Sequence, residues 1–293
     1  MTDLPAGVAL KIEKPSRFSR RRRLGTITIA SPDRDVLRDV DISGAVADSS
    51  ADVLMDLADR DLSGSSLRGT RLIGGRWDHL TGTGLKLRDA VLASAVWTGC
   101  SLIRMDARNA FFGLGGRFDV TRSSFTRCDL RGAVFGDCAF SHTVFDTCRV
   151  DTARFEVTDF TEVSFIGKYR DLTFSREPSG AYRRDFGMTD HIQAAPSLDF
   201  SFADLSWISF QGGVDLSRVR LGDRPGRLIL LDWQDRLAAA RLSNLYRVSR
   251  DVASIVDVWS QDSQQSAYLL VERDVLAHCG EADGAALLLA LTG

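Results

Sequence analysis

A large apolar residue returns every five positions between residues 62 and 165. The second half of this stretch keeps the period without a break: Phe125, Leu130, Phe135, Phe140, Phe145, Val150, Phe155, Phe160 and Phe165. An α-helix repeats every 3.6 residues and a strand every 2, so neither element alone gives this spacing. Sustained over about a hundred residues, the period predicts a repeat architecture in which similar units stack on one another.

Each five-residue unit carries a second, smaller residue two positions before the large one. Ala, Ser, Thr and Cys dominate at this position, and two residues that lie two apart point to the same side of an extended backbone. One large and one small inward side chain per unit is what close packing inside a narrow tube requires. Four of the five cysteines fall on the small position: Cys100, Cys128, Cys138 and Cys148. We therefore expect them to be buried filler and not metal ligands or redox groups.

The units Cys128-Asp129-Leu130-Arg131-Gly132 and Ala203-Asp204-Leu205-Ser206-Trp207 resemble the pentapeptide-repeat family, which is bacterial. The resemblance covers roughly residues 42–221 and implies a mainly β fold: a right-handed quadrilateral parallel β-helix, or β-solenoid, with four units per coil. At strand spacing the candidate units give about six coils and a rod about 30 Å long. The expected structural core consists of Leu62, Leu67, Leu72, Leu87, Leu92, Leu102, Phe125, Leu130, Phe135, Phe140, Phe145, Phe155, Phe160, Phe165, Phe200, Leu205 and Phe210.

The chain divides into three parts. Residues 1–40 form a basic lead-in, in which the alternation at 26–29 predicts a short strand that caps the open end of the repeats. Residues 41–224 form the β-helix, with a glycine-rich slip of the period at 113–116 and an insertion at about 166–197. Residues 225–293 lose the period and form a C-terminal α-helical tail, which serves either as a cap or as a dimerisation segment.

Within the insertion, residues 166–174 are predicted to form a strand, 177–180 a turn and 181–190 a returning strand. Two interpretations remain open: a hairpin or widened coil folded against the solenoid, and a projecting arm that binds a partner. Its aromatic and basic side chains are the candidate partner-binding residues: Tyr169, Arg170, Arg183, Arg184 and Phe186.

The C-terminal part is predicted to contain four helical segments. The spacing of apolar residues at 248–259 is that of an amphipathic helix, and residues 228–245 are rich in Ala and Leu. A third helix is expected from 263 to about 278, ended by Gly280. Asp283 is expected to cap a short last helix.

Composition excludes several functional classes. The net charge of −2 lacks the basic excess of a general nucleic-acid binder, so we expect no direct nucleic-acid binding. No apolar run is long enough to span a bilayer, and the four arginines at 20–23 are not followed by the apolar stretch of a secretory signal. Five cysteines without a CxxC pair fit the cytoplasm. We expect no catalytic residues, no metal site and no cofactor, and hence no enzyme.

Two functions fit these features. The first is a non-enzymatic interaction scaffold whose flat faces bind another protein. The second follows from the resemblance, because some pentapeptide-repeat proteins bind type II topoisomerases such as gyrase by mimicking DNA and protect them from inhibitors. A DNA mimic needs a continuous acidic stripe on one face, whereas evenly mixed charges would count against it. A homodimer through the C-terminal helices is a further expectation.

Overall fold

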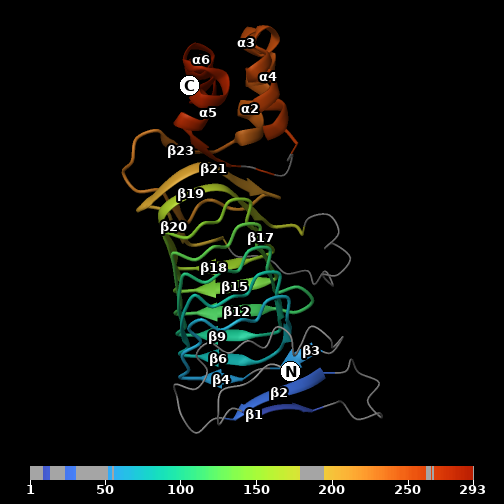
Figure 1. The fold of residues 1–293 in the computed structure, drawn as a ribbon. Helices are drawn as coiled ribbons and strands as arrows, with labels where there is room; N and C mark the ends of the chain where they lie inside the picture. Colours follow the sequence, from blue (N-terminus) through green and yellow to red (C-terminus); the bar gives the residue numbers. More distant parts are fainter. Residues whose placement is uncertain are drawn as a thin grey trace.

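The computed structural model describes residues 56–178, 195–261, 265 and 267–292, together with the backbone of three strands nearer the N-terminus. The chain winds into a parallel β-solenoid of about seven turns, with a short helical unit at its C-terminal end (Figure 1). The sequence predicted about six turns, because the units before Leu62 were not counted and the unit at β19 does not keep the period. Strands on three sides of each turn pair in parallel with the turns before and after.

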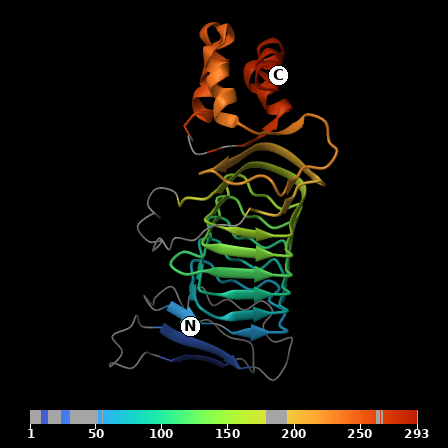
Figure 2. The same cartoon turned by 180° about the vertical axis from the view of Figure 1, so that it is seen from behind.

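Four faces make up the solenoid. The β14 face consists of β3 Asp52–Leu54, β5 Arg71–Ile73, β8 Val91–Ala93, β11 Phe111–Phe112, β14 Val134–Gly136 and β17 Arg154–Glu156. The β15 face consists of β4 Leu57–Ala58, β6 Arg76–Asp78, β9 Val96–Thr98, β12 Phe118–Thr121, β15 Cys138–Ser141 and β18 Asp159–Thr161. The β13 face begins with β7 Thr81–Thr83, β10 Ser101–Ile103, β13 Ser124–Thr126 and β16 Val144–Asp146. The fourth, which we call the bridge face, is joined by single parallel bridges through Ser66, Lys86, Asp106, Asp129 and Arg149. Figure 2 shows the stacked strands from behind.

The corner residue of a unit explains why the repeat is five residues long. This residue lies two positions after the large one and takes a positive φ: 55° at Asn109 and 67° at Gly132, for example. Three residues of extended backbone then run along each face, and the left-handed corner redirects the chain. Gly and Asp, which tolerate this conformation well, recur at the corners, and Arg and Thr occupy several others.

Large side chains twenty or so residues apart stack into columns inside the tube. Phe125, Phe145 and Phe165 stack with ring centroids 5.0 and 4.9 Å apart, and Trp77 stacks on Trp97 at 4.5 Å. All the residues predicted for the structural core are buried. The tube is therefore a packed interior and not a channel.

Where the large position holds a small residue, the neighbouring small position holds a large one. Gly82 and Ala107 interrupt the large series, and two positions before them lie Leu80 and Met105, both fully buried. The side chain two residues away points to the same interior, so it fills the space that the small residue leaves. The packing volume is thus conserved over the pair.

The slip of the period lies in a turn between β11 and β12. A Cβ at Gly113 would lie 1.7 Å from the carbonyl oxygen of Gly136, and a Cβ at Gly116 would lie 2.0 Å from Oγ of Ser94. Glycine is required at 113 because its φ is 80° and the next turn of the backbone passes against it.

The first part of the predicted insertion belongs to the coil itself. Strand β19 runs from Val163 to Ser175 along the β13 face, the bridge face and the β14 face in turn, and pairs with both β16 and β17. Val144 and Arg154 are ten residues apart, whereas their partners Ser164 and Thr173 are nine apart, so β19 is one residue shorter. Both corners keep a positive φ, at Gly167 and Asp171, so the missing residue belongs to the bridge face between them. β21 Ala203–Gln211 pairs along β19, and β20 Leu198–Asp199 and β22 Val219–Arg220 continue the β13 face. The predicted returning strand lies outside the described residues.

Near the N-terminus, β1 Ala9–Glu13 pairs antiparallel with β2 Leu24–Ala30, which pairs in parallel with β3. Strand β2 includes the alternating segment at 26–29 and extends the β14 face by one strand. The first edge of that sheet is therefore covered by a hairpin.

The C-terminal unit joins a two-stranded sheet to a small group of helices. In this sheet β23 Arg227–Leu230 pairs antiparallel with β24 Tyr268–Val271. The helices are α2 Trp233–Leu242, α3 Asn244–Val248, α4 Arg250–Trp259, α5 Glu272–Cys279 and α6 Glu281–Thr292. Side chains alternate across β24: Leu269 and Val271 join the solenoid core, whereas Leu270 joins the helical core. The strand is thus a two-sided wall between the two cores.

Two of the predicted helices are wrong in their first parts. Residues 227–230 and 268–271 form strands, because pairing with each other and packing on the solenoid override the helical preference of Leu and Ala. Val248 is 71% exposed and ends α3, so the amphipathic helix begins only at Arg250. Asp283 lies in the first turn of α6 and does not precede it. Gly280 follows α5 with a φ of 78°, as a helix stop does.

Candidate interaction surfaces

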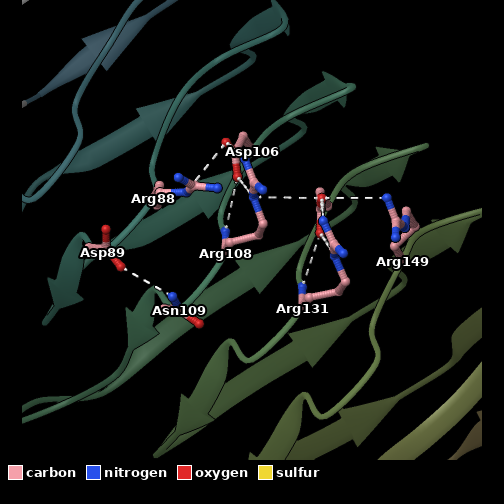
Figure 3. A network of polar contacts seen from close by, with 8 residues as sticks. Arg88, Asp89, Asp106, Arg108, Asn109, Arg131 and Arg149 are labelled. Atoms are coloured by element: carbon pink, nitrogen blue, oxygen red, sulfur yellow. Dashed lines mark hydrogen bonds and ion pairs between the residues drawn. The ribbon is translucent and has the colours of Figure 1, made fainter.

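Aspartates and arginines lie side by side on the bridge face. They come from the residues just before and just after the large inward residue. Two successive coils each contribute an Asp–Arg pair, and the coils before and after them contribute one arginine each. We call this group the Asp–Arg ladder: Arg88, Asp106, Arg108, Asp129, Arg131 and Arg149 (Figure 3). Their positions are fixed because the inward residues between them are buried.

Within a coil, the pairs of the ladder are bidentate. Arg108 donates from Nε and Nη2 to the two oxygens of Asp106 at 2.8 and 2.7 Å, and Arg131 does the same to Asp129 at 2.8 and 2.7 Å. Two parallel hydrogen bonds hold a guanidinium in one orientation, which a single contact does not do.

Between coils, longer ion pairs connect these units. Arg88 lies 3.9 Å from Asp106, Arg108 lies 3.7 Å from Asp129, and Arg149 lies 4.0 Å from Asp129. The hydrogen bonds from Arg108 hold the pKa of Asp106 below its usual value. Burial raises the pKa of Asp129, but the hydrogen bonds from Arg131 outweigh it, so that this pKa is also lowered. Both carboxylates are therefore ionised at neutral pH and the ladder is fully charged.

The remaining described faces differ in character. The β13 face carries hydroxyls at Thr81, Ser101 and Ser124 in register and few charges. The β15 face carries acidic residues at Asp78, Asp119 and Asp159, interrupted by uncharged residues on β9 and β15. Arg117 lies among these carboxylates, 3.0 Å from Asp119 and 2.8 Å from Asp159. No described face carries a continuous acidic stripe.

The structure separates the predicted partner-binding residues. Tyr169 is 1% exposed, and its hydroxyl donates to the carbonyl oxygens of Phe145 and Ile166 at 2.7 and 3.0 Å. Its side chain faces inward because β19 is part of the coil, so it is unavailable to a partner. Arg170 is exposed and contacts Asp151 and Asp171. Arg183, Arg184 and Phe186 lie outside the described residues.

The cysteines are all buried and none is in a disulfide. Burial raises the pKa of Cys100 to about 11, and it raises that of Cys138 well above the usual value. Their thiols donate to backbone carbonyls of the preceding coil, for example Cys138 to Phe112 at 3.4 Å. A protonated buried thiol is a poor nucleophile, so these groups serve packing.

Two surfaces near the C-terminal unit were not foreseen from the sequence. A cavity of about 640 Å³ opens between the last coil and the helices and is lined by aromatic rings of Trp207, Trp259, Tyr268 and His278. Trp207 is 40% exposed and its ring meets that of His278 at 6.1 Å. A second cavity lies beside β23. Both depend on the β23–β24 pairing, and the only available signal was the short apolar run at 268–271, which periodicity alone does not assign.

Other kinds of site are not evident in the described part of the chain. There, no three or more His, Cys, Asp or Glu side chains are grouped so that they could hold a metal ion. None of the described helices is both long and apolar enough to cross a membrane.

The five-residue units and their four-faced parallel coil define a pentapeptide-repeat β-helix. The coil is similar to solved structures of QnrB1, a plasmid-mediated fluoroquinolone resistance protein. Full-length QnrB1 is 15% identical, with a TM-score of 0.25 over 60% of this chain and 91% of that one. A trypsin-treated variant is 13% identical, with a TM-score of 0.25 over 61% of this chain and 86% of that one. No protein-family model and no curated protein sequence matches the chain.

Proposed function

We propose that this protein is a non-enzymatic interaction scaffold that binds another protein through the bridge face. The observation that supports this most is the Asp–Arg ladder, in which bidentate pairs fix the guanidinium groups on a packed tube. A partner that binds an already ordered array loses less side-chain entropy than one that must order flexible arginines. The regular strand spacing also sets the distance between successive charges.

An affinity capture from the source cells tests the proposal. The wild-type protein is compared with the double variant Arg108→Ser and Arg131→Ser, and with Arg104→Ser, which removes an exposed arginine outside the ladder. We expect a protein that copurifies with the wild type and with Arg104→Ser but is lost from the double variant. Capture of the same proteins by all three would contradict the assignment to the bridge face.

The alternative is a DNA-mimicking binder of a type II topoisomerase. The mixed charges of the ladder and the interrupted acids of the β15 face count against it, because mimicry of a duplex needs continuous negative charge. We therefore expect that adding the protein leaves both gyrase supercoiling and its inhibitor sensitivity unchanged. A concentration-dependent change in either would favour the topoisomerase function over the general scaffold.

We also propose a homodimer through the C-terminal helices. Exposed apolar side chains on the helical unit support it, namely Leu231, Leu242, Val248, Val258 and Leu289. Light scattering after size exclusion should give twice the monomer mass of 32.2 kDa, and a mass that stays at the monomer value at high concentration would refute the dimer. The five free cysteines support a cytoplasmic location.

A further inference from the structure

The second cavity lies where the C-terminal unit meets the last coil, and its volume is about 720 Å³. Strand β21 forms one wall through Asp204 and Leu205. Strand β23 and the first turn of α5 form the other, through Arg227 and Arg273. Asp204 and Leu205 pair with Lys168 and Tyr169, so the cavity lies at the C-terminal end of the bridge face, beyond the Asp–Arg ladder. It shares no lining residue with the aromatic cavity.

Arg227 is the unusual residue of this cavity. Its side chain is only 6% exposed, and its nearest acid, Asp204, is 3.6 Å from Nη2. Nη1 is buried and finds no hydrogen-bond partner among the described residues. A buried donor without an acceptor costs free energy, and a charged one costs more than a neutral one. Arg227 lines the cavity, so an acceptor that reaches Nη1 from it would gain a strong hydrogen bond.

The acids of the cavity do not fully satisfy its arginines. Asp204 is shared, because Arg273 places Nη1 3.2 Å from the same oxygen and donates from Nη2 to the carbonyl of Leu205 at 2.8 Å. Burial lowers the pKa of Arg227, as do the charges of Arg224 and Arg273, although Asp204 acts in the opposite direction. One carboxylate thus serves two guanidinium groups, and Nη1 of Arg227 is left without an acceptor.

The walls indicate which anion fits. Three arginines line the cavity with three acids, Asp204, Glu272 and Glu281, so its formal charge is balanced. A doubly charged phosphate would meet these carboxylates, whereas a single carboxylate needs only the free donor of Arg227. Leu205, Val271 and Leu276 form apolar walls next to that donor.

We propose that this cavity recognises an acidic residue of a partner protein, whose carboxylate accepts a hydrogen bond from Nη1 of Arg227 while an adjacent apolar side chain contacts Leu205 and Leu276. This proposal adds a specific binding site to the scaffold function, and it rests on that function for the existence of a partner. The binding chemistry itself is testable without the partner.

The probe is the capped dipeptide acetyl-Leu-Glu-amide, and its neutral match is acetyl-Leu-Gln-amide. Binding to the full-length protein is followed by NMR of the arginine Nε–H resonances and by the melting temperature. We expect the acidic dipeptide to shift the Arg227 resonance saturably and to raise the melting temperature, and the neutral one to do neither. Equal responses to both dipeptides, or none to either, would overturn the proposal.

Variants and simple anions complete the test. Arg227→Gln and Arg227→Lys should weaken binding of the acidic dipeptide by roughly tenfold or more, whereas Arg220→Gln, outside the cavity, should not. Arg227→Gln should keep or raise the melting temperature of the free protein, because it removes a buried donor without a partner.

If acetate binds as tightly as the dipeptide, the site takes a free small anion, and if inorganic phosphate binds more tightly, the carboxylate assignment is wrong. If a partner is captured but the dipeptide does not bind, the proposal for this cavity is refuted and the scaffold function is not.

Discussion

Phe145 lies in one of the stacked columns of the tube, fully buried between Phe125 and Phe165. Replacing it with Asp would place a carboxylate between the rings of Phe125 and Phe165, neither of which carries a hydrogen-bond donor. We therefore expect Phe145→Asp to abolish folding. Phe145→Leu keeps an apolar side chain and should cost roughly 1–2 kcal/mol. Circular dichroism and thermal melting measure both. A wild-type melting temperature for Phe145→Asp would contradict the inward assignment.

The exchange of large and small residues at Leu80 and Gly82 makes a prediction about coupling. Leu80→Ala alone should cost roughly 2–5 kcal/mol through the cavity it leaves, and Gly82→Leu alone should cost roughly 1–3 kcal/mol through overpacking. Gly82 lies in β7 without a positive φ, so its backbone accepts a side chain. The loss of unfolding free energy in the double variant should be smaller than the sum of the two single losses, by about 1 kcal/mol or more. Additive unfolding free energies from urea titration would show that the two positions do not share one space.

The thiols give a prediction that depends on pH. Because burial raises the pKa of Cys100 to about 11, the folded protein holds its proton where an unfolded thiol, with a pKa of about 8.5, would lose it. The stability from this proton is present below pH 8.5 and is lost as the pH rises toward 11. At pH 8 we expect iodoacetamide to label the native cysteines far more slowly than those of the urea-unfolded protein. Rapid labelling of native Cys128 or Cys138 would contradict the proposed packing role.

At the scale of elements, Asp274 connects the C-terminal unit to the solenoid. It is 7% exposed at the start of α5, accepts from Oγ of Ser206 at 2.8 Å and also accepts from the backbone N–H of Trp207. Asp274→Ala leaves both donors unpaired and should destabilise the protein by roughly 2–3 kcal/mol. Asp257→Ala, which removes an exposed carboxylate bonded to Tyr246, should cost less than about 1 kcal/mol. If the two variants have the same melting temperature, Asp274 does not have this role.

The elements of the solenoid could be predicted from the sequence, and those of the C-terminal unit only in part. In the solenoid, Phe135 and Phe155 occupy equivalent places, so the period itself carries the fold. β23 and β24 pair across about forty residues, and the apolar runs that form them are compatible with either a helix or a strand. The inward position of Tyr169 was missed for a related reason, because one residue is deleted from the bridge-face segment of β19, which changes the side chains that face the core.

The candidate site could also be predicted from the sequence only in part. The Asp and Arg positions of the bridge face are visible in the repeat motif, but their bidentate pairing depends on rotamers that the sequence does not specify. Arg227 comes close to Asp204 and Arg273 only when the β23–β24 sheet has packed on β21. A site assembled from segments that are far apart in the chain leaves no local pattern.

At the scale of the whole molecule, the described residues form two separate apolar cores joined by one strand. The solenoid core extends through all the coils, whereas the helical core is small and centres on Trp233, Val252 and Leu291. Repeat arrays gain stability from each neighbouring unit, so the central coils should open least often. The helical unit, which has fewer buried neighbours, should open independently and more often.

Hydrogen exchange followed by mass spectrometry tests this difference. We expect amides of β13 and β16 to exchange most slowly and those of α2, α4 and α6 to exchange faster. Leu270 faces the helical core and Leu269 faces the solenoid core across the same strand. Leu270→Ala should therefore speed exchange in the helices and leave β13 and β16 unchanged, while Leu269→Ala should also speed exchange in β21, on which β24 packs. Uniform acceleration by both variants would mean that the two cores unfold as one unit, and that the β23–β24 sheet couples them.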